Sequence, residues 1–128
     1  MDFNEQQPIF RQIEDYCQQR IVGGAWHEGE RIPRTKEQAL DLSVNNRTVM
    51  NAYDSLAEKG VIYQRRGLGY YVADGAVELI MKLQREEFMK VSVPEIARKM
   101  RELNISLDDL TERLRSLCAA VGQCLTQT

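Results

Sequence analysis

The chain has 128 residues, of which 43% are hydrophobic and 28% are charged, and its formal net charge at pH 7 is −2. This length suits one compact domain, or a small domain with a helical appendage. No apolar run approaches the roughly 20 residues that span a bilayer, and the N-terminus lacks the basic and apolar regions of a signal peptide. We therefore expect a cytoplasmic chain with no membrane partner. The slight excess of acid argues against a surface that is basic throughout, so a nucleic-acid site would require local clustering of charge.

Three cysteines and a single histidine limit the metal and disulfide chemistry of the chain. Cys17, Cys118 and Cys124 are odd in number, and their spacings match no disulfide framework. His27 has no Cys or second His nearby, which argues against a zinc site. We therefore predict no metal, no cofactor and thiols that serve as small buried packing groups. A redox sensor is an alternative that no pattern supports.

A first helix is predicted after Pro8, which is tolerated in a first turn because its missing N–H needs no partner there. Its apolar residues recur at helical spacing up to the glycine pair at 23–24, and they are Ile9, Ile13, Tyr16, Cys17 and Ile21. A turn around Gly29 then leads into a short extended segment that ends at Pro33. We interpret the helix as core scaffold and expect two core residues in the segment after it, Trp26 and Ile32.

Two further helices joined by a short turn are predicted next. Thr35 is the expected N-cap of a short helix over residues 36–42, whose apolar contacts would be Ala39, Leu40 and Leu42. Val44 is expected to anchor the turn, and Asn45 or Asn46 to cap the following helix. That helix is predicted to end at a left-handed Gly60 and to bury one face, formed by Val49, Ala52, Tyr53 and Leu56.

With that face buried, the first turns of the same helix present polar groups to solvent. The outward residues are Asn46, Arg47, Met50 and Asn51. An Asn side chain can bind adenine through two hydrogen bonds, Arg can bind guanine, and an apolar group can contact a thymine methyl. The pattern fits a DNA-reading helix, and it fits equally well a solvated helix start with capping asparagines.

A tight β-hairpin is predicted after the third helix. Residues 61–66 and 70–73 are rich in β-branched and aromatic side chains, and Gly67, Leu68 and Gly69 lie between them. Arg65 and Arg66 lie at the tip, where two exposed arginines favour an anionic partner. A helix-turn-helix followed by a basic hairpin is the winged-helix arrangement, in which one helix enters the major groove and the hairpin reaches the adjacent backbone or minor groove.

The order and spacing of these motifs resemble the DNA-binding domain of GntR-family transcriptional regulators. The shared patterns are P-I-F-x-Q-I from Pro8, G-x-x-x-x-G-E-R-I-P from Gly24, L-A-x-x-G from Leu56 and R-x-G-x-G from Arg65. The third helix, with V-N-x-x-T-V-M-x-A-Y from Val44, and the short helical tail are most similar to the YtrA subfamily. The family usually has Leu-Pro-Ser where this chain has Ile-Pro-Arg at 32–34.

The resemblance implies a winged helix-turn-helix repressor that binds a palindromic operator in double-stranded DNA as a homodimer, commonly at an ABC-transporter operon. It also implies which positions face DNA, at the start of the second helix, on the third helix and in the wing. These are Arg34, Thr35, Lys36, Asn45, Asn46, Arg47, Thr48, Asn51, Arg65, Arg66, Gly67, Leu68 and Gly69. The operator sequence and any small-molecule effector are not readable from these residues.

The rest of the chain is predicted to be wholly helical, which divides it into a winged helix-turn-helix domain at 1–74 and a helical dimerisation region at 75–128. One helical segment offers Val77, Ile80, Leu83 and Phe88 for packing. Ser92 is expected to cap a second, whose stripe is Val93, Ile96, Ala97, Met100 and Leu103. Ser106 opens a last helix with a seam formed by Leu107, Leu110, Leu114, Leu117 and Val121. This seam either forms the dimer interface or packs on the first helices of the same chain.

No catalytic group of residues is apparent. The adjacent acids at 86–87 and 108–109 diverge around their helices, and the glycines of the hairpin precede a strand instead of the helix of a nucleotide-binding loop. The predicted fold is therefore mostly α with a small β-hairpin wing, and the predicted function is that of a DNA-binding regulator and not of an enzyme. The alternative is a protein-interaction adaptor that uses the winged domain as its binding surface.

Overall fold

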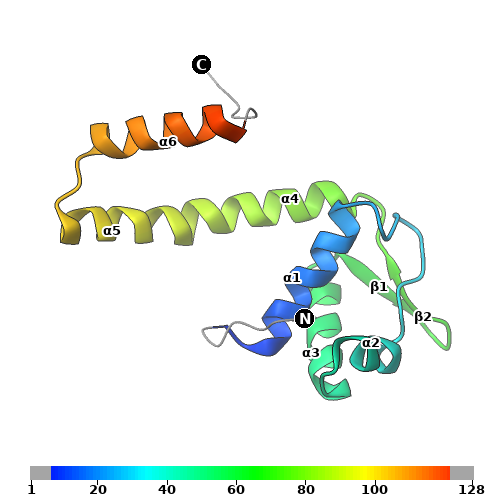
Figure 1. Ribbon diagram of the computed structural model, residues 1–128. Helices are drawn as coiled ribbons and strands as arrows, with labels where there is room; N and C mark the ends of the chain where they lie inside the picture. The colour runs from blue at the N-terminus through cyan, green and yellow to red at the C-terminus, as the bar shows by residue number, and fades with distance from the viewer. Residues whose placement is uncertain (1–6, 122–128) are drawn as a thin grey trace. The chain divides into compact units, whose positions relative to one another are not determined.

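The computed structural model describes residues 7–121, without the side chain of residue 121 (Figure 1). The elements in chain order are α1 (Ile9–Val22), α2 (Thr35–Leu42), α3 (Asn46–Glu58), β1 (Ile62–Arg65), β2 (Gly69–Val72), α4 (Ala76–Glu87), the π-helical turn η1 (Phe88–Ser92), α5 (Val93–Leu103) and α6 (Leu107–Val121). The chain divides into two compact units, Met1–Gln84 and Arg85–Thr128.

The first unit is built around α3, which packs against both α1 and α2 (Figure 1). The four residues predicted to form its inward face are all fully buried, as are Ile13 and Cys17 of α1. Burial and the nearby Glu14 carboxylate raise the pKa of the Cys17 thiol to about 12, which fits a packing residue and not a reactive one. The left-handed Gly60 directly after the end of α3 is also confirmed, with a φ of 85°.

The wing is a two-stranded antiparallel hairpin in which Ile62 pairs with Val72 and Arg65 pairs with Gly69. The extended segment before α2 lies along the outer side of β2. Arg31 forms a bridge with Tyr71, and the Ile32 amide donates to the Tyr70 carbonyl at 3.0 Å. The strands therefore form a winged helix-turn-helix with the helices, and the predicted fold class is confirmed.

The first unit continues into α4 and ends at Gln84, ten residues after the predicted division at 74. Ala76 and Ile80 of α4 are fully buried in the core of the winged unit. The Glu28 carboxylate accepts hydrogen bonds from the Gly75 amide at 2.8 Å and from the Val77 amide at 3.4 Å, which satisfies free donors at the start of the helix. The beginning of α4 thus belongs structurally to the winged unit.

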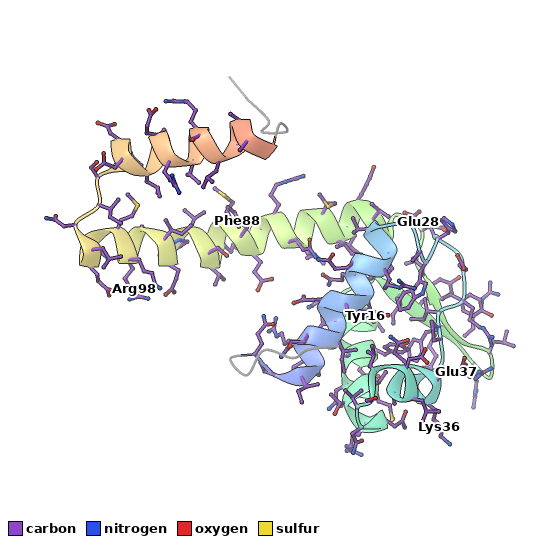
Figure 2. All side chains as sticks on the ribbon, in the orientation of Figure 1. Tyr16, Glu28, Lys36, Glu37, Phe88 and Arg98 are labelled. Carbon is purple, nitrogen blue, oxygen red and sulfur yellow. The ribbon has the colours of Figure 1, made fainter. Side chains whose placement is uncertain are left out.

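Several local predictions are wrong. Arg34, and not Thr35, is the N-cap of α2, and the Glu37 carboxylate accepts from its amide. Leu40 is 82% exposed, because α2 turns this side away from the core. Ser92 does not cap α5, since its backbone is helical and the chain passes from α4 through η1 into α5 without a loop. Phe88 is exposed on that stretch (Figure 2).

The second unit is helical, and none of its described side chains from residue 85 to 120 is buried. Ser106 caps α6 as predicted, with its hydroxyl oxygen accepting from the Asp109 amide at 3.1 Å. The prediction of a plain packing thiol is wrong for Cys118, which is disulfide-bonded. Cys124 lies outside the described residues.

A buried carboxylate links the first and third helices. The Lys59 ammonium at the end of α3 donates to one oxygen of Glu14 on α1, whose side chain is almost completely buried. The other oxygen of Glu14 has no hydrogen-bond partner among the described protein atoms. An ion left in the core without its partner is costly, so the stability of the α1–α3 pair depends on this lysine.

Lys59→Ala is therefore expected to lower the free energy of unfolding by about 2 kcal/mol, since it removes a hydrogen bond to a charged buried group. Urea denaturation followed by circular dichroism measures this loss. Lys82→Ala is the matched control because Lys82 is exposed on α4, and it should leave the midpoint unchanged. Adding Glu14→Gln to Lys59→Ala should recover part of the loss, and equal stability of the parent and Lys59→Ala would contradict the role assigned to the ion pair.

Candidate nucleic-acid interface

The first turns of α3 present polar side chains to solvent. Arg47, Met50 and Asn51 are exposed, while Asn46 and Thr48 are half-buried. The opposite face is locked in the core by Val49 and its helical neighbours, so the outward direction of these side chains is fixed by packing. The predicted orientation of the helix is therefore confirmed.

The two asparagines at this end have different local roles. The Asn45 carboxamide oxygen accepts from the Arg47 amide at 2.8 Å, which makes Asn45 the N-cap of α3. The Asn46 amide group contacts the Met50 sulfur at 3.6 Å, and its carbonyl oxygen is buried without a partner among the described atoms. Asn45 thus uses its oxygen within the protein, whereas Arg47 and Asn51 present exposed side chains to a partner.

The start of α2 adds two exposed cations at a helix N-terminus. Arg34 and Lys36 are exposed, and Thr35 between them is half-buried. Figure 2 shows Lys36 extending away from the body of the unit. Helix N-termini attract anions because their first amides lack partners inside the helix and the helix dipole is positive there. This end of α2 has the chemistry of a phosphate contact.

A side chain joins the start of α2 to the wing. The Arg34 guanidinium Nη2 donates to the Leu68 carbonyl oxygen in the wing loop at 3.4 Å. Arg66, Gly67 and Leu68 form that loop, in which Gly67 has a φ of 77° that suits glycine. This hydrogen bond brings Arg34 next to the wing loop, although the two residues are 34 positions apart in the sequence.

A buried tyrosine of α3 contacts both the segment before α2 and the wing, and so holds the three in one arrangement. The hydroxyl of Tyr53 on α3 donates to the Pro33 carbonyl oxygen at 2.8 Å, just before α2. The ring of Tyr53 makes an edge contact with Tyr70 of β2, with centroids 5.1 Å apart. Burial is the main cause that raises the pKa of Tyr53, so its hydroxyl stays a donor at all physiological pH values.

Three residues near the predicted site were not identified from the sequence. Arg31 lies beside β2, with its Cδ 3.8 Å from the position that a Cβ at Gly69 would occupy. Tyr63 and Tyr71 stack on each other across the hairpin, and the Arg65 guanidinium lies over Tyr71. The alternation of the two strands could have placed both tyrosines on one face with Arg65. The bridge of Arg31 to β2 had no such signal.

The residues predicted to form the dimer seam belong to the second unit. Leu107 is 70% exposed, Leu114 and Leu117 are each 51% exposed, and Leu110 is half-buried. Residue Val121 is helical, but its side chain lies outside the described residues. The described seam residues thus leave a row of leucine side chains open along α6.

Two kinds of site are absent from the part of the chain that the structure describes. Its titratable side chains include no group of three or more His, Cys, Asp or Glu that could hold a metal ion. None of the helices between residues 7 and 121 combines the length and the apolar character that a bilayer crossing requires.

Comparisons with known proteins agree with this geometry. The family model described as bacterial regulatory proteins, gntR family, matches residues 10–72. The crystal structure of a GntR-family transcriptional regulator from Bacteroides thetaiotaomicron has a TM-score of 0.76 and 34% identity, over 90% of this chain and 100% of that one. The HTH-type transcriptional regulator YhcF of Bacillus subtilis is 25% identical over 114 residues, which are 89% of this chain and 93% of the relative.

A fourth similarity concerns the fold alone. The DNA-binding domain of AraR, in a crystal structure with operator ORR3, has a TM-score of 0.52 and 23% identity, over 57% of this chain and 88% of that one.

Tyr53→Phe is expected to destabilise the first unit by about 1 kcal/mol, because it leaves the Pro33 carbonyl without its donor. Chemical denaturation measures the loss, and amide hydrogen exchange at residues 34–36 should accelerate because the start of α2 is no longer held. Tyr63→Phe removes a hydroxyl from an exposed ring and is the control. Equal stability and equal exchange of the two variants would show that the Tyr53 hydroxyl does not hold this segment.

Proposed function

This chain belongs to the GntR family of bacterial DNA-binding transcriptional regulators, and we propose that it acts as a homodimeric repressor on a palindromic operator. The observation that carries the proposal is the exposure of Arg47 and Asn51 on α3 together with two further basic groups, the start of α2 and the wing. Arg34 connects the start of α2 to the wing through its hydrogen bond to the Leu68 carbonyl. Together they offer a base-reading helix end and two groups of residues for contacts with the DNA backbone.

We assign recognition of the DNA base sequence to the first turns of α3, which would lie in the major groove. Arg47 and Asn51 supply the hydrogen-bonding groups that distinguish guanine and adenine, and exposed Met50 supplies an apolar contact for a thymine methyl. Asn46 and Thr48 lie beside them at the edge of the contact. Asn45 acts mainly through its cap, which holds the Arg47 backbone in place.

Phosphate binding is assigned to the α2 start and the wing. Arg34, Thr35 and Lys36 present a positive helix end, and Arg65 and Arg66 present two further cations. Gly67, Leu68 and Gly69 shape the wing loop so that its backbone can approach the duplex. The AraR domain, which has a similar fold, was crystallised with its operator, and this supports DNA as the partner here.

Dimerisation is assigned to the helical region at 75–128, through the seam that includes Leu107, Leu110, Leu114, Leu117 and Val121. A unit of 44 residues with no buried side chain among its described residues has little core of its own, and a second copy would cover its leucines. Two-fold symmetry would also place two recognition helices about 34 Å apart, one turn of DNA.

The remaining finer assignments follow from the same resemblance. We assign the chain to the YtrA subfamily, to the cytoplasm where the bacterial chromosome lies, and to the control of a transporter operon. A small-molecule effector, if the regulator uses one, is unidentified. The adaptor alternative is not favoured, because the relatives compared above over about nine-tenths of this chain are transcriptional regulators.

The proposed function is tested by selection of binding sites from random double-stranded DNA, followed by titration of the selected site at several salt concentrations. A palindromic consensus and a slope of log affinity against log salt of about −0.9 for each neutralised phosphate are expected. An unselective pool, or binding with no dependence on salt, would overturn the proposal.

Arg47→Ala is expected to weaken binding to the selected operator by about 10-fold or more, because a bidentate contact to guanine contributes about 1–3 kcal/mol of discrimination. Its binding to unrelated DNA should change much less. Fluorescence anisotropy with both DNAs measures the difference, and Arg85→Ala, an exposed arginine outside the interface, is the control. An unchanged operator affinity would show that α3 does not read bases through Arg47.

Leu114→Asp is expected to convert the dimer into monomers, because it places a charge in an apolar seam that would be desolvated on pairing. Analytical ultracentrifugation measures the mass in solution. Ser116→Asp adds the same charge on the other side of α6 and should leave the dimer intact. A Leu114→Asp protein that sediments as the parent dimer would place the interface elsewhere.

A further inference from the structure

We propose that Tyr71 and Tyr63 are positioning residues, which form an aromatic platform that holds the Arg65 guanidinium in the orientation used to bind the DNA backbone. The inference rests on the proposed function, since it names how one wing arginine is prepared for its contact. It assigns a role to two tyrosines that neither motif nor charge singled out.

The register of the hairpin puts the three side chains on one face. Tyr63 pairs directly with Tyr71, and Arg65 lies two residues further along the same strand as Tyr63. Because side chains alternate between the two faces of a strand, Tyr63, Tyr71 and Arg65 share one face, while Ile62 and Val72 face the core. The tyrosine rings are stacked, with centroids 5.8 Å apart and planes inclined by 21°.

The guanidinium carbon of Arg65 lies 4.9 Å from the centroid of Tyr71 and 6.0 Å from that of Tyr63. Both distances are within the range of a cation–π contact, and the shorter one identifies Tyr71 as the main support. The residue directly opposite Arg65 is Gly69, which has no side chain. The diagonal Tyr71 ring is therefore the surface available to the arginine.

This contact leaves the hydrogen-bonding capacity of Arg65 free. A guanidinium that lies over a ring uses its π face for the ring and keeps its N–H groups at the edge, where they can donate to phosphate oxygens. A long side chain that is already oriented loses less freedom when it binds. Arg66 in the adjacent turn has no such aromatic support within the described residues, so the two wing arginines are not equivalent.

The test is a double-mutant cycle between Tyr71→Leu and Arg65→Ala, with affinity measured for an operator selected from random DNA. Tyr71→Leu should weaken binding by about three- to fivefold, the effect expected of an exposed cation–π contact. Tyr71→Phe keeps the ring and should bind as the parent does. In the Arg65→Ala background, Tyr71→Leu should have no further effect. Tyr63→Leu should give a smaller loss, also absent in that background.

A second measurement examines the free protein. The side-chain protons of Arg65 should show upfield ring-current shifts in NMR spectra of the parent and of Tyr71→Phe, and these shifts should disappear in Tyr71→Leu. Thermal unfolding of each variant checks that the wing stays folded, and Tyr63→Leu supplies the cycle if Tyr71→Leu does not fold.

The outcomes separate the two proposals. If the parent binds an operator but Tyr71→Leu weakens it equally with and without Arg65, or if Arg65 shows no ring-current shift, the positioning role is overturned and the proposed function stands. If the parent selects no DNA at all, the proposed function itself fails, and the role of the platform in binding fails with it.

Discussion

The arrangement of the surface that we propose to bind DNA depends on one buried side chain, Tyr53. Its ring fills the centre of the core from α3, its hydroxyl holds the Pro33 carbonyl before α2, and its edge meets Tyr70 of the wing. Three elements that are distant in sequence therefore meet at one tyrosine. A buried donor without an acceptor is costly, so the hydroxyl favours this one packing over alternatives in which the segment before α2 moves away.

The arginines of this surface differ in how strongly contacts within the protein fix their orientation. Arg34 reaches the wing loop, Arg65 rests on an aromatic pair, and Arg47 is aimed by a helix whose opposite face is buried. The orientation of individual arginines matters for a chain with a net charge of −2. Such a chain lacks the general attraction of a basic protein for DNA, so a few well-placed cations must supply the local field. The second unit has the opposite character, because its described side chains expose a row of leucines with no core of their own.

Much of the local structure was predictable because it depends on neighbours in sequence. The buried face of α3, a cap at Asn45 or Asn46, the left-handed Gly60 and the tight hairpin all follow from periodicity and backbone preference. The structure confirms them and shows that the cap is Asn45. The errors arise where the local signal is ambiguous. Thr35 is a residue type that often caps helices, but it lies one position after the actual N-cap, Arg34. Leu40 was expected to contact the core, but a helix of only eight residues is too short for apolar spacing to define its buried face well. Ser92 resembles a cap, but the preceding turns continue through it.

The sequence by itself determined the family, the order of the elements and which residues of α3 turn outward, because these features depend on motifs and on the spacing of neighbouring residues. Only the tertiary structure decided how the basic residues are supported. Arg34 and Leu68, Tyr53 and Pro33, and Arg65 and Tyr71 become neighbours through chain reversals whose geometry no local pattern encodes. A long side chain takes its orientation from what it touches, and for these residues the contacts exist only once the wing has packed against the helices.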